Sequence, residues 1–219
     1  MTTRSVLVTS VTDYLMRYSP TATADPTFAN MTNIWLGNAE NRWAREIRLR
    51  QQEVTVEPFT VSGRNANLPE DFLQLRALTR TSDQTGARRY LEQMTPETLR
   101  ESEFWNYDVS GEPKAFCVEG DELVFAPSAA ADTELSMLYF ARLNRFASAE
   151  DTNALLQNHF DIALASAIVE AALFVQDLAL AGTWEQTYRM KLQSLKRSEN
   201  RARFRGSAAI RTGTPRTII

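Results

Sequence analysis

The sequence has only one cysteine and one histidine among its 219 residues. The single cysteine, Cys117, excludes a disulfide bond within the chain. The single histidine, His159, leaves no set of cysteine and histidine ligands of the kind that binds zinc. Cys117 lies between Phe116 and Val118, so we predict a buried side chain that acts as a small hydrophobe. His159 has no partner nearby in the sequence, and we assign it a packing or capping role.

Long uninterrupted hydrophobic runs are also missing. The most apolar stretch, residues 155–177, is interrupted by acidic residues, so it is not the run of about 18 to 20 apolar residues that spans a bilayer. These acidic residues are Asp161, Glu170 and Asp177. Asp13 and Arg17 stand where a signal peptide would have its apolar region and cleavage site. We therefore expect a protein in the cytosol or in a virion.

Catalytic and nucleotide-binding motifs are absent from the sequence. It contains no P-loop, no G-x-G-x-x-G and no G-x-S-x-G. The acidic pairs Glu70-Asp71 and Glu119 with Asp121 fall in predicted turns, without the supporting acid or ligands that acid–base or metal chemistry needs. We predict that the chain is not an enzyme and that it has no catalytic, cofactor-binding or metal-binding residues.

Lysine is rare, and the charge is distributed unevenly along the chain. There are 21 arginines and 3 lysines. From Arg189 onward the chain has nine basic residues and one acid, Glu199, whereas the first 188 residues have 15 bases and 26 acids. A basic C-terminal arm on an acidic body predicts attraction to an acidic partner, either nucleic acid, a neighbouring copy or another protein. The abundance of arginine favours a protein contact, because guanidinium groups pair with carboxylates in a bidentate manner.

This arm belongs to the stretch that organises the chain, residues 151–205. An apolar segment that can be buried almost all round is followed by Gly182 and then by a segment with a narrow apolar stripe and a cationic surface. We predict two helices with the glycine between them. Their predicted core residues are Ile162, Ile168, Phe174, Trp184 and Leu195. Four aromatic residues fall at helical spacing with other apolar residues, which favours a core role over base stacking; they are Trp35, Trp43, Trp184 and Tyr188.

Helical spacing also marks the beginning of the chain. Residues 5–18 predict a helix whose apolar positions are Val8, Val11, Leu15 and Tyr18. A second helix of about 24 residues is predicted from Asp25 and Pro26, a cap followed by a proline at the first helical position, to near Gln51. Its apolar positions are Phe28, Met31, Trp35, Ala39, Trp43 and Ile47.

Between the helical segments the hydrophobic period changes to that of strands. Strands are predicted at residues 53–63, where Pro58 marks a bulge or an edge, at Leu73–Thr79 and at residues 87–95. Thr95, followed by Pro96, is predicted to cap a short helix.

A hairpin and a last strand complete the predicted sheet. Gly120 and Asp121 lie between two apolar strands and predict the turn of the hairpin. Residues 133–144 alternate, with Leu135, Met137, Tyr139 and Ala141 on one face. Helix is predicted to return at residues 148–153.

The order of helices, strands and helices predicts an α+β fold. We predict that residues 1–50 and 151–205 form a helical bundle and that residues 51–150 form an inserted antiparallel β-sheet domain. Residues 206–219 contain Gly, Thr and Pro without helical period, which predicts an extended C-terminal tail.

Four segments, in order, resemble head-to-tail adaptor proteins of tailed bacteriophages. An early helix carries Ala39-Glu40 and Arg45-Glu46-Ile47-Arg48, and a turn reads Leu68-Pro69-x-Asp71-Phe72-Leu73. A hairpin is followed by a strand that ends in Tyr139-Phe140. A closing helical pair carries Ala167, Glu170, Ala171 and Ala172 and then Trp184 and Tyr188. The resemblance covers residues 28–203, while the first 20 residues and the tail depart from the pattern.

The resemblance implies a structural protein at the neck of the virion, the junction of head and tail. Such proteins form rings, commonly of twelve copies, that bind the portal protein on one side and a tail or nozzle protein on the other. Double-stranded DNA passes through the lumen without sequence-specific binding. We expect no membrane partner and no cofactor.

The basic arm and the tail are the predicted contact with the portal or with neighbouring subunits. The candidate residues are Arg197, Arg201, Arg203, Arg205, Ile210, Arg211, Arg216, Ile218 and Ile219. The alternative is a DNA-binding or packaging accessory protein that uses the basic C-terminal helix, which steep salt dependence of duplex binding would reveal. A tail hydrolase would need a clustered acid pair or a metal set, and the sequence has neither.

Overall fold

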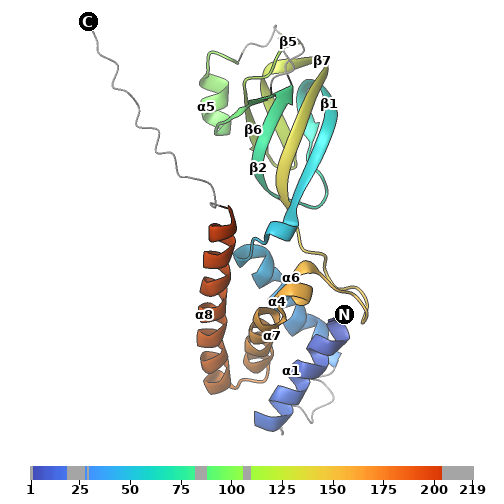
Figure 1. The fold of residues 1–219 in the computed structure, drawn as a ribbon, viewed down its shortest axis with the longest axis vertical. Coiled ribbons are helices and arrows are strands. Elements are labelled where there is room, and N and C mark those ends of the chain that lie inside the picture. The colour runs from blue at the N-terminus through green and yellow to red at the C-terminus, as the bar shows by residue number, and fades with distance from the viewer. Residues whose placement is uncertain (1, 19–27, 29, 82–87, 106–109, 204–219) are drawn as a thin grey trace, which may run out of the picture. The chain divides into compact units, whose positions relative to one another are not determined.

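A computed structural model describes residues 2–18, 28, 30–81, 88–105 and 110–203. Within these ranges the protein is an α+β chain with six α-helices and a mixed sheet. The chain divides into two compact units, one formed by residues 1–49 and 144–219 and the other by residues 50–143. We call them the helical unit and the β unit and describe each by itself (Figure 1).

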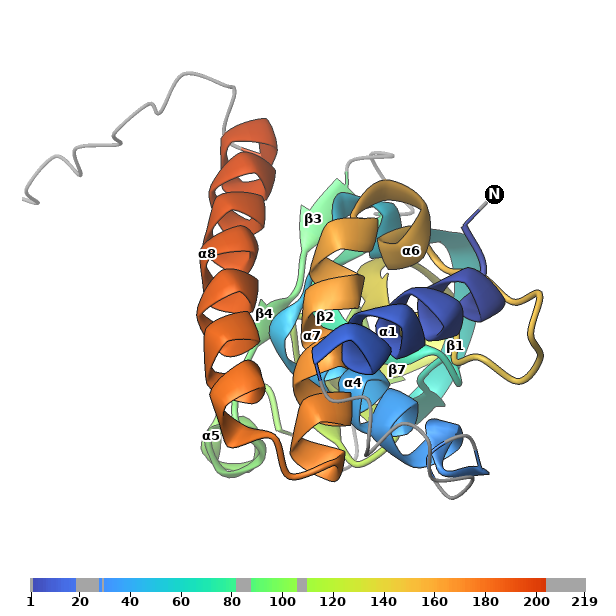
Figure 2. The same cartoon turned by 90° about the horizontal axis from the view of Figure 1, so that it is seen from below.

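The helical unit is arranged around a central helix, α7. Its helices are α1 (Arg4–Tyr18), α4 (Thr32–Glu46), α6 (Ala154–Asn158), α7 (Phe160–Phe174) and α8 (Leu178–Arg203). Helix α7 lies between α8 on one side and α1 with α4 on the other (Figures 1 and 2). Small residues allow this close packing, since Ala163, Ala167 and Ala171 of α7 are fully buried.

The first helix buries two of its four predicted apolar positions, Val11 and Leu15, but it buries Leu7 and not Val8 or Tyr18. Leu7, Val11 and Leu15 are fully buried, at a spacing of four residues. Val8 is half-buried and Tyr18 is 59% exposed. The segment has more apolar side chains than a single stripe can hold, so periodicity identified the helix but not the side that packs.

Helix α4 ends at Glu46, five residues before the predicted end near Gln51. Ile47 adopts extended backbone angles, with φ −109° and ψ 134°, so it cannot continue the helix. Ile47 and Leu49 remain buried because alternate residues of an extended segment point to the same side. The predicted start of this helix at Asp25 and Pro26 lies outside the described residues.

The break between α7 and α8 is not at Gly182, which lies inside α8. Helix α7 ends in a Schellman motif: the N–H of Asp177 donates to Ala172 O at 2.9 Å and that of Gln176 to Leu173 O at 3.1 Å. Gln176 takes the left-handed conformation with φ 62°. Asp177 then caps α8, since its carboxylate accepts from the Leu180 N–H at 3.0 Å.

Two further predictions for this helical pair require correction. Residues 148–153 are not helical; the helix begins at Ala154, and Asn153 caps it by accepting from the Leu156 N–H at 3.0 Å. Of the predicted core residues, Ile162, Ile168 and Leu195 are buried. Phe174 is 38% exposed and Trp184 is half-buried, because both lie near the turn, where fewer helices surround them.

The β unit is organised by one long strand, β7 (Glu122–Ala141). A short 3-10 helix, Arg50–Gln52, precedes β1 (Glu53–Asn67), β2 (Phe72–Thr81), β3 (Arg88–Tyr90), β4 (Glu92–Gln93), α5 (Pro96–Glu101), β5 (Ser110–Gly111) and β6 (Ala115–Glu119). The strand order is β3-β2-β7-β6-β4, and β1 and β5 also pair with β7. The second strand of the predicted hairpin and the predicted last strand are therefore one continuous strand.

The sheet is mixed rather than antiparallel as predicted. The long pairs of β7 with β1, β2 and β6 are antiparallel, but the two-residue pairs β4–β6 and β5–β7 are parallel. The predicted strand at residues 87–95 is split into β3 and β4, with the buried Leu91 between them. These short strands lack a hydrophobic period long enough to reveal their pairing.

Other local predictions for the β unit are confirmed. The register of β1 shifts between Val56 and Phe59, at the predicted bulge by Pro58. Gly120, with φ 60°, forms the β6–β7 turn with Asp121, and Thr95 caps α5. Cys117 is buried. The alternating residues of β7 face the core; they are Leu135, Met137, Tyr139 and Ala141.

The Schellman turn predicts that replacing glutamine by glycine has opposite effects on stability at two positions. Gln176→Gly removes the steric cost of a left-handed non-glycine residue and should stabilise the protein by about 1 kcal/mol. Gln186→Gly, at an exposed position inside α8, should destabilise it by about 1 kcal/mol. Urea unfolding of the two variants measures both effects. Destabilisation by Gln176→Gly would contradict the assigned turn.

Candidate functional site

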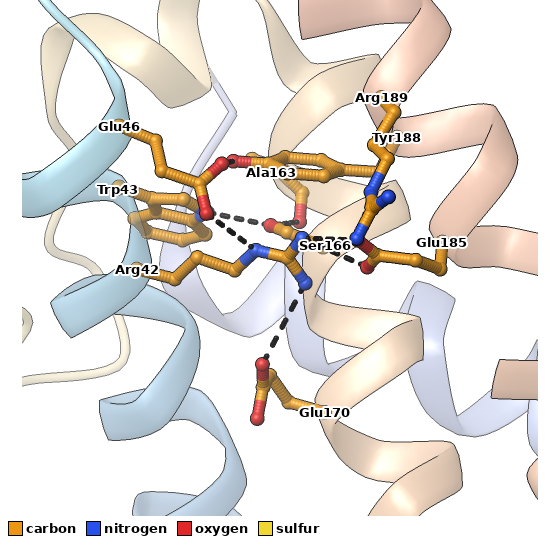
Figure 3. A network of polar contacts seen from close by, with 9 residues as sticks. All are labelled: Arg42, Trp43, Glu46, Ala163, Ser166, Glu170, Glu185, Tyr188 and Arg189. Carbon is orange, nitrogen blue, oxygen red and sulfur yellow. Dashed lines mark hydrogen bonds and ion pairs between the residues drawn. The ribbon is translucent and has the colours of Figure 1, made fainter. Parts of the chain in front are cut away.

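A cluster of charged groups in the helical unit is centred on the guanidinium of Arg42 on α4, whose side chain is 12% exposed. Three carboxylates surround it (Figure 3). Its Nε donates to Glu46 at 3.2 Å, its Nη2 donates to Glu185 at 2.8 Å, and its Nη1 lies 3.8 Å from Glu170. Because these acids come from α4, α8 and α7, one cation connects three helices.

Tyr188 of α8 completes this cluster from one side. Its ring centroid lies 4.2 Å from Arg42 Cζ, a distance at which the π face attracts the cation. Its hydroxyl donates to Glu46 Oε2 at 2.9 Å. Burial, followed by this hydrogen bond to Glu46, raises the pKa of the fully buried Tyr188, so the phenol remains a donor at neutral pH.

A second buried hydrogen bond lies beside the Arg42 cluster. The indole N–H of Trp43 donates to Ser166 Oγ at 2.5 Å, and the Ser166 hydroxyl donates to Ala163 O at 2.9 Å. Both bonds appear in Figure 3. Because Ser166 is fully buried, these two hydrogen bonds satisfy polar groups that would otherwise destabilise the interior.

The acids around Arg42 have opposite pKa shifts. Burial favours the neutral form of Glu185, but the hydrogen bonds from Arg42 and Arg189 prevail and lower its pKa. Burial raises the pKa of Glu170, and the more distant positive charges of Arg42 and Arg45 only partly oppose it. The pKa of Arg42 itself is raised: burial works against its charge, but Glu185 and Glu46 outweigh burial.

The chemistry of this cluster is that of a structural connection. Arg42 and Arg189 face Glu46, Glu170 and Glu185, and the Tyr188 hydroxyl donates to Glu46. Within the described ranges, no group of three or more His, Cys, Asp or Glu side chains is arranged to hold a metal ion. The Cys117 thiol has a pKa raised to about 11 by burial and by Glu119, so it is protonated at neutral pH.

The structure divides the basic residues of α8 into two groups. Arg189 pairs with Glu185 at 2.6 Å and Lys191 with Asp161 at 3.0 Å, so both have acidic partners within the helical unit. Arg197 and Arg201 are exposed, and no ion pair joins either of them to another described residue. Arg203 lies in the last turn of α8. The remaining candidates lie outside the described residues: Arg205, Ile210, Arg211, Arg216, Ile218 and Ile219.

The sequence interpretation overlooked Arg42 as a functional candidate. The sequence does indicate one of its ion pairs, because Arg42 and Glu46 are four residues apart on one helix face. The partner Glu185 is 143 residues away, and the spacing of residues on one helix cannot identify it.

Residues of the phage-adaptor motifs converge at two places. Glu46, Glu170 and Tyr188, from two of the four motifs, belong to the Arg42 cluster. In the β unit, the Tyr139 hydroxyl donates to Asp71 at 2.8 Å, and the ring of Tyr139 stacks on Phe72 at 5.7 Å. The motif residues at both places therefore hold parts of the fold together.

The motif residues thus make internal connections within an α+β fold. Over residues 2–212, the chain matches the family model described as SU10 adaptor protein. The chain belongs to that adaptor family, in agreement with its resemblance to phage head-to-tail adaptors, and is a bacteriophage virion component. A search of curated proteins found no match. Within the described ranges, no helix combines the length and apolarity needed to cross a membrane.

The opposite pKa shifts predict opposite effects of removing two acids that face the same arginine. Because the pKa of Glu185 is lowered in the folded protein, its negative charge stabilises the fold above about pH 4.5. This stabilisation is lost as the pH falls from there through the folded-state pKa. Glu185→Gln should therefore reduce stability at pH 7 by about 1 to 2 kcal/mol. Thermal unfolding from pH 3 to pH 8 measures the effect.

Glu170→Gln is the matched variant. Because the pKa of Glu170 is raised, its ionisation costs stability as pH rises from about 4.5 through the folded-state pKa. The amide removes this cost, so the melting temperature at pH 7 should stay unchanged or rise. A large loss of stability in Glu170→Gln at pH 7 would show that its attraction to Arg42 outweighs its burial.

Proposed function

We propose that this protein is a head-to-tail adaptor that forms a ring between the portal and the tail of a phage virion, with DNA passing through the lumen. Membership of the adaptor family across residues 2–212 is the observation that carries the proposal. The ring has twelve copies, sits at the neck, and contacts the portal protein on one side and a tail or nozzle protein on the other.

The charge of the two units supports assembly through unlike surfaces. The helical unit has 15 basic and 11 acidic residues, and the β unit has 9 basic and 16 acidic residues. A ring made by rotation needs two different, complementary surfaces on each copy. An acidic unit and a basic unit in one chain can supply them.

We assign separate roles to the parts of the chain. The helices of residues 1–50 and 151–205 form a bundle that is the scaffold of each subunit, and residues 51–150 form the inserted sheet domain. The exposed arginines at the end of α8 and the tail, residues 206–219, contact the portal and neighbouring subunits. Because Arg189 and Lys191 are paired within the helical unit, this contact uses the residues that follow them.

The first prediction of this proposal concerns assembly. Purified protein should be monomeric at low concentration and form rings on the portal or at high concentration, because a ring closes only when all of its contacts form together. Mass photometry and negative-stain microscopy, with and without the portal of the same phage, measure this. A stable dimer that ignores added portal would contradict the proposal, and so would steeply salt-sensitive binding to duplex DNA without portal binding.

The second prediction concerns the tail. Deletion of residues 206–219 should leave the melting temperature unchanged and abolish binding to the portal, because these residues contain Gly, Thr and Pro without the apolar period of a core element. A chain in which a Gly/Ser linker of equal length replaces these residues is the matched control, and it should also fail to bind. Normal portal binding by the truncated protein would show that the tail is not the contact.

A further inference from the structure

The outward face of α8 has a shallow groove that the described part of the chain leaves unoccupied. It is lined by Met190, Gln193, Ser194, Arg197, Ser198 and Arg201. These positions follow the spacing of three and four residues that defines one helix face. The buried residues Tyr188, Leu192 and Leu195 lie on the opposite face. The groove therefore points away from the helical unit.

The groove is lined by short side chains, with charged and apolar side chains beside them. Ser194 and Ser198 have short side chains, so another backbone can approach α8 between the larger residues. Met190 is 66% exposed and adds apolar surface to the groove. Arg197 and Arg201 are one helical turn apart, and neither forms an ion pair with a described residue.

A complementary acidic face exists on α5 in the β unit. Leu99 is fully buried against Cys117 and Val124. Glu97 and Glu101 each lie two residues from Leu99, about 200° around the helix, so both project outward and are exposed. The Glu97 carboxylate accepts hydrogen bonds from its own backbone N–H and from Thr95, which lower its pKa together with the nearby charge of Arg100. Neither Glu97 nor Glu101 forms an ion pair with a base in the described ranges.

We propose that the α8 groove of one copy binds the acidic face of α5 of a neighbouring copy, with Glu97 and Glu101 paired to Arg197 and Arg201. The two acids and the two bases are each four residues apart on a helix, which corresponds to about 6 Å along the axis in both cases. The pairs can therefore form together. This inference rests on the proposed ring and names the surfaces that close it.

The chemistry of the groove suits a protein better than nucleic acid. Only two of its six lining residues are cationic, and the others are Met, Ser and Gln. Affinity for duplex DNA depends on many phosphate contacts. Arginine pairs well with carboxylates, and an exposed methionine adds apolar contact that a phosphate backbone does not match.

Charge reversal tests the contact in the full chain. The groove variant carries Arg197→Glu and Arg201→Glu, and the acid variant carries Glu97→Arg and Glu101→Arg. Each variant alone should self-associate at least about tenfold more weakly than wild type, because every contact then joins like charges. An equimolar mixture should recover association, since the two variants can alternate around a ring with opposite charges at every contact. Sedimentation velocity over a concentration series measures association, and circular dichroism checks that each variant is folded.

Lys196→Glu is the matched control, compared with Arg197→Glu alone. It makes the same change of charge on the same helix, at an exposed residue that does not line the groove. It should associate within about threefold of wild type, a difference of less than about 1 kcal/mol.

Two outcomes overturn the inference: a groove variant that associates like wild type, and a mixture that does not recover association. If the groove variant associates like wild type but loses binding to duplex DNA, the groove is a nucleic-acid contact instead. Association of wild type reports on the proposed ring itself, so absence of wild-type rings, even on the portal, would overturn the proposed function as well as the contact.

Discussion

The helical unit depends on the position of the Arg42 guanidinium. A cation with a side chain only 12% exposed is costly unless charged partners replace its water, and here Glu46, Glu185 and the more distant Glu170 do so. The ring of Tyr188 covers the cation, and its hydroxyl holds Glu46 in place. Because Glu185 and Tyr188 lie on α8, this interaction determines which face of α8 turns inward. The same constraint turns Met190, Arg197 and Arg201 outward, where they are available to a partner.

The long strand β7 has the corresponding role in the β unit. It pairs with β1 along its length, with β6 through its first part and with β2 through its second part. Near its end, Tyr139 holds the turn before β2 through Asp71 and Phe72. Helix α5 packs Leu99 on a separate cluster of apolar residues from β6 and β7. Glu97 and Glu101, which face outward on α5, are therefore held in position by the packing of this helix, as a contact surface requires.

Charged residues serve two purposes in this protein. Those near the middle of α8 are neutralised within the helical unit, as the pairs Arg189–Glu185 and Lys191–Asp161 show. Farther along α8, Lys196, Arg197 and Arg201 are exposed. A net charge of −3 for the whole chain conceals this division. In an adaptor, such a division lets the same chain hold its own helices and attract an acidic neighbour.

The sequence by itself determined the α+β class, most of the helices and strands, the cap at Thr95 and the motifs of the adaptor family. Local signals are enough for these features: apolar periodicity located α1 and α4, and the Gly120-Asp121 turn located the hairpin. The tertiary structure decided which face of α1 is buried, that α8 begins after Gln176 and not at Gly182, and that β7 is continuous. It also brought Arg42 to Glu185, 143 residues away. Packing between distant segments makes these choices, because several helix faces and strand pairings satisfy the local pattern equally well and only the assembled core distinguishes them.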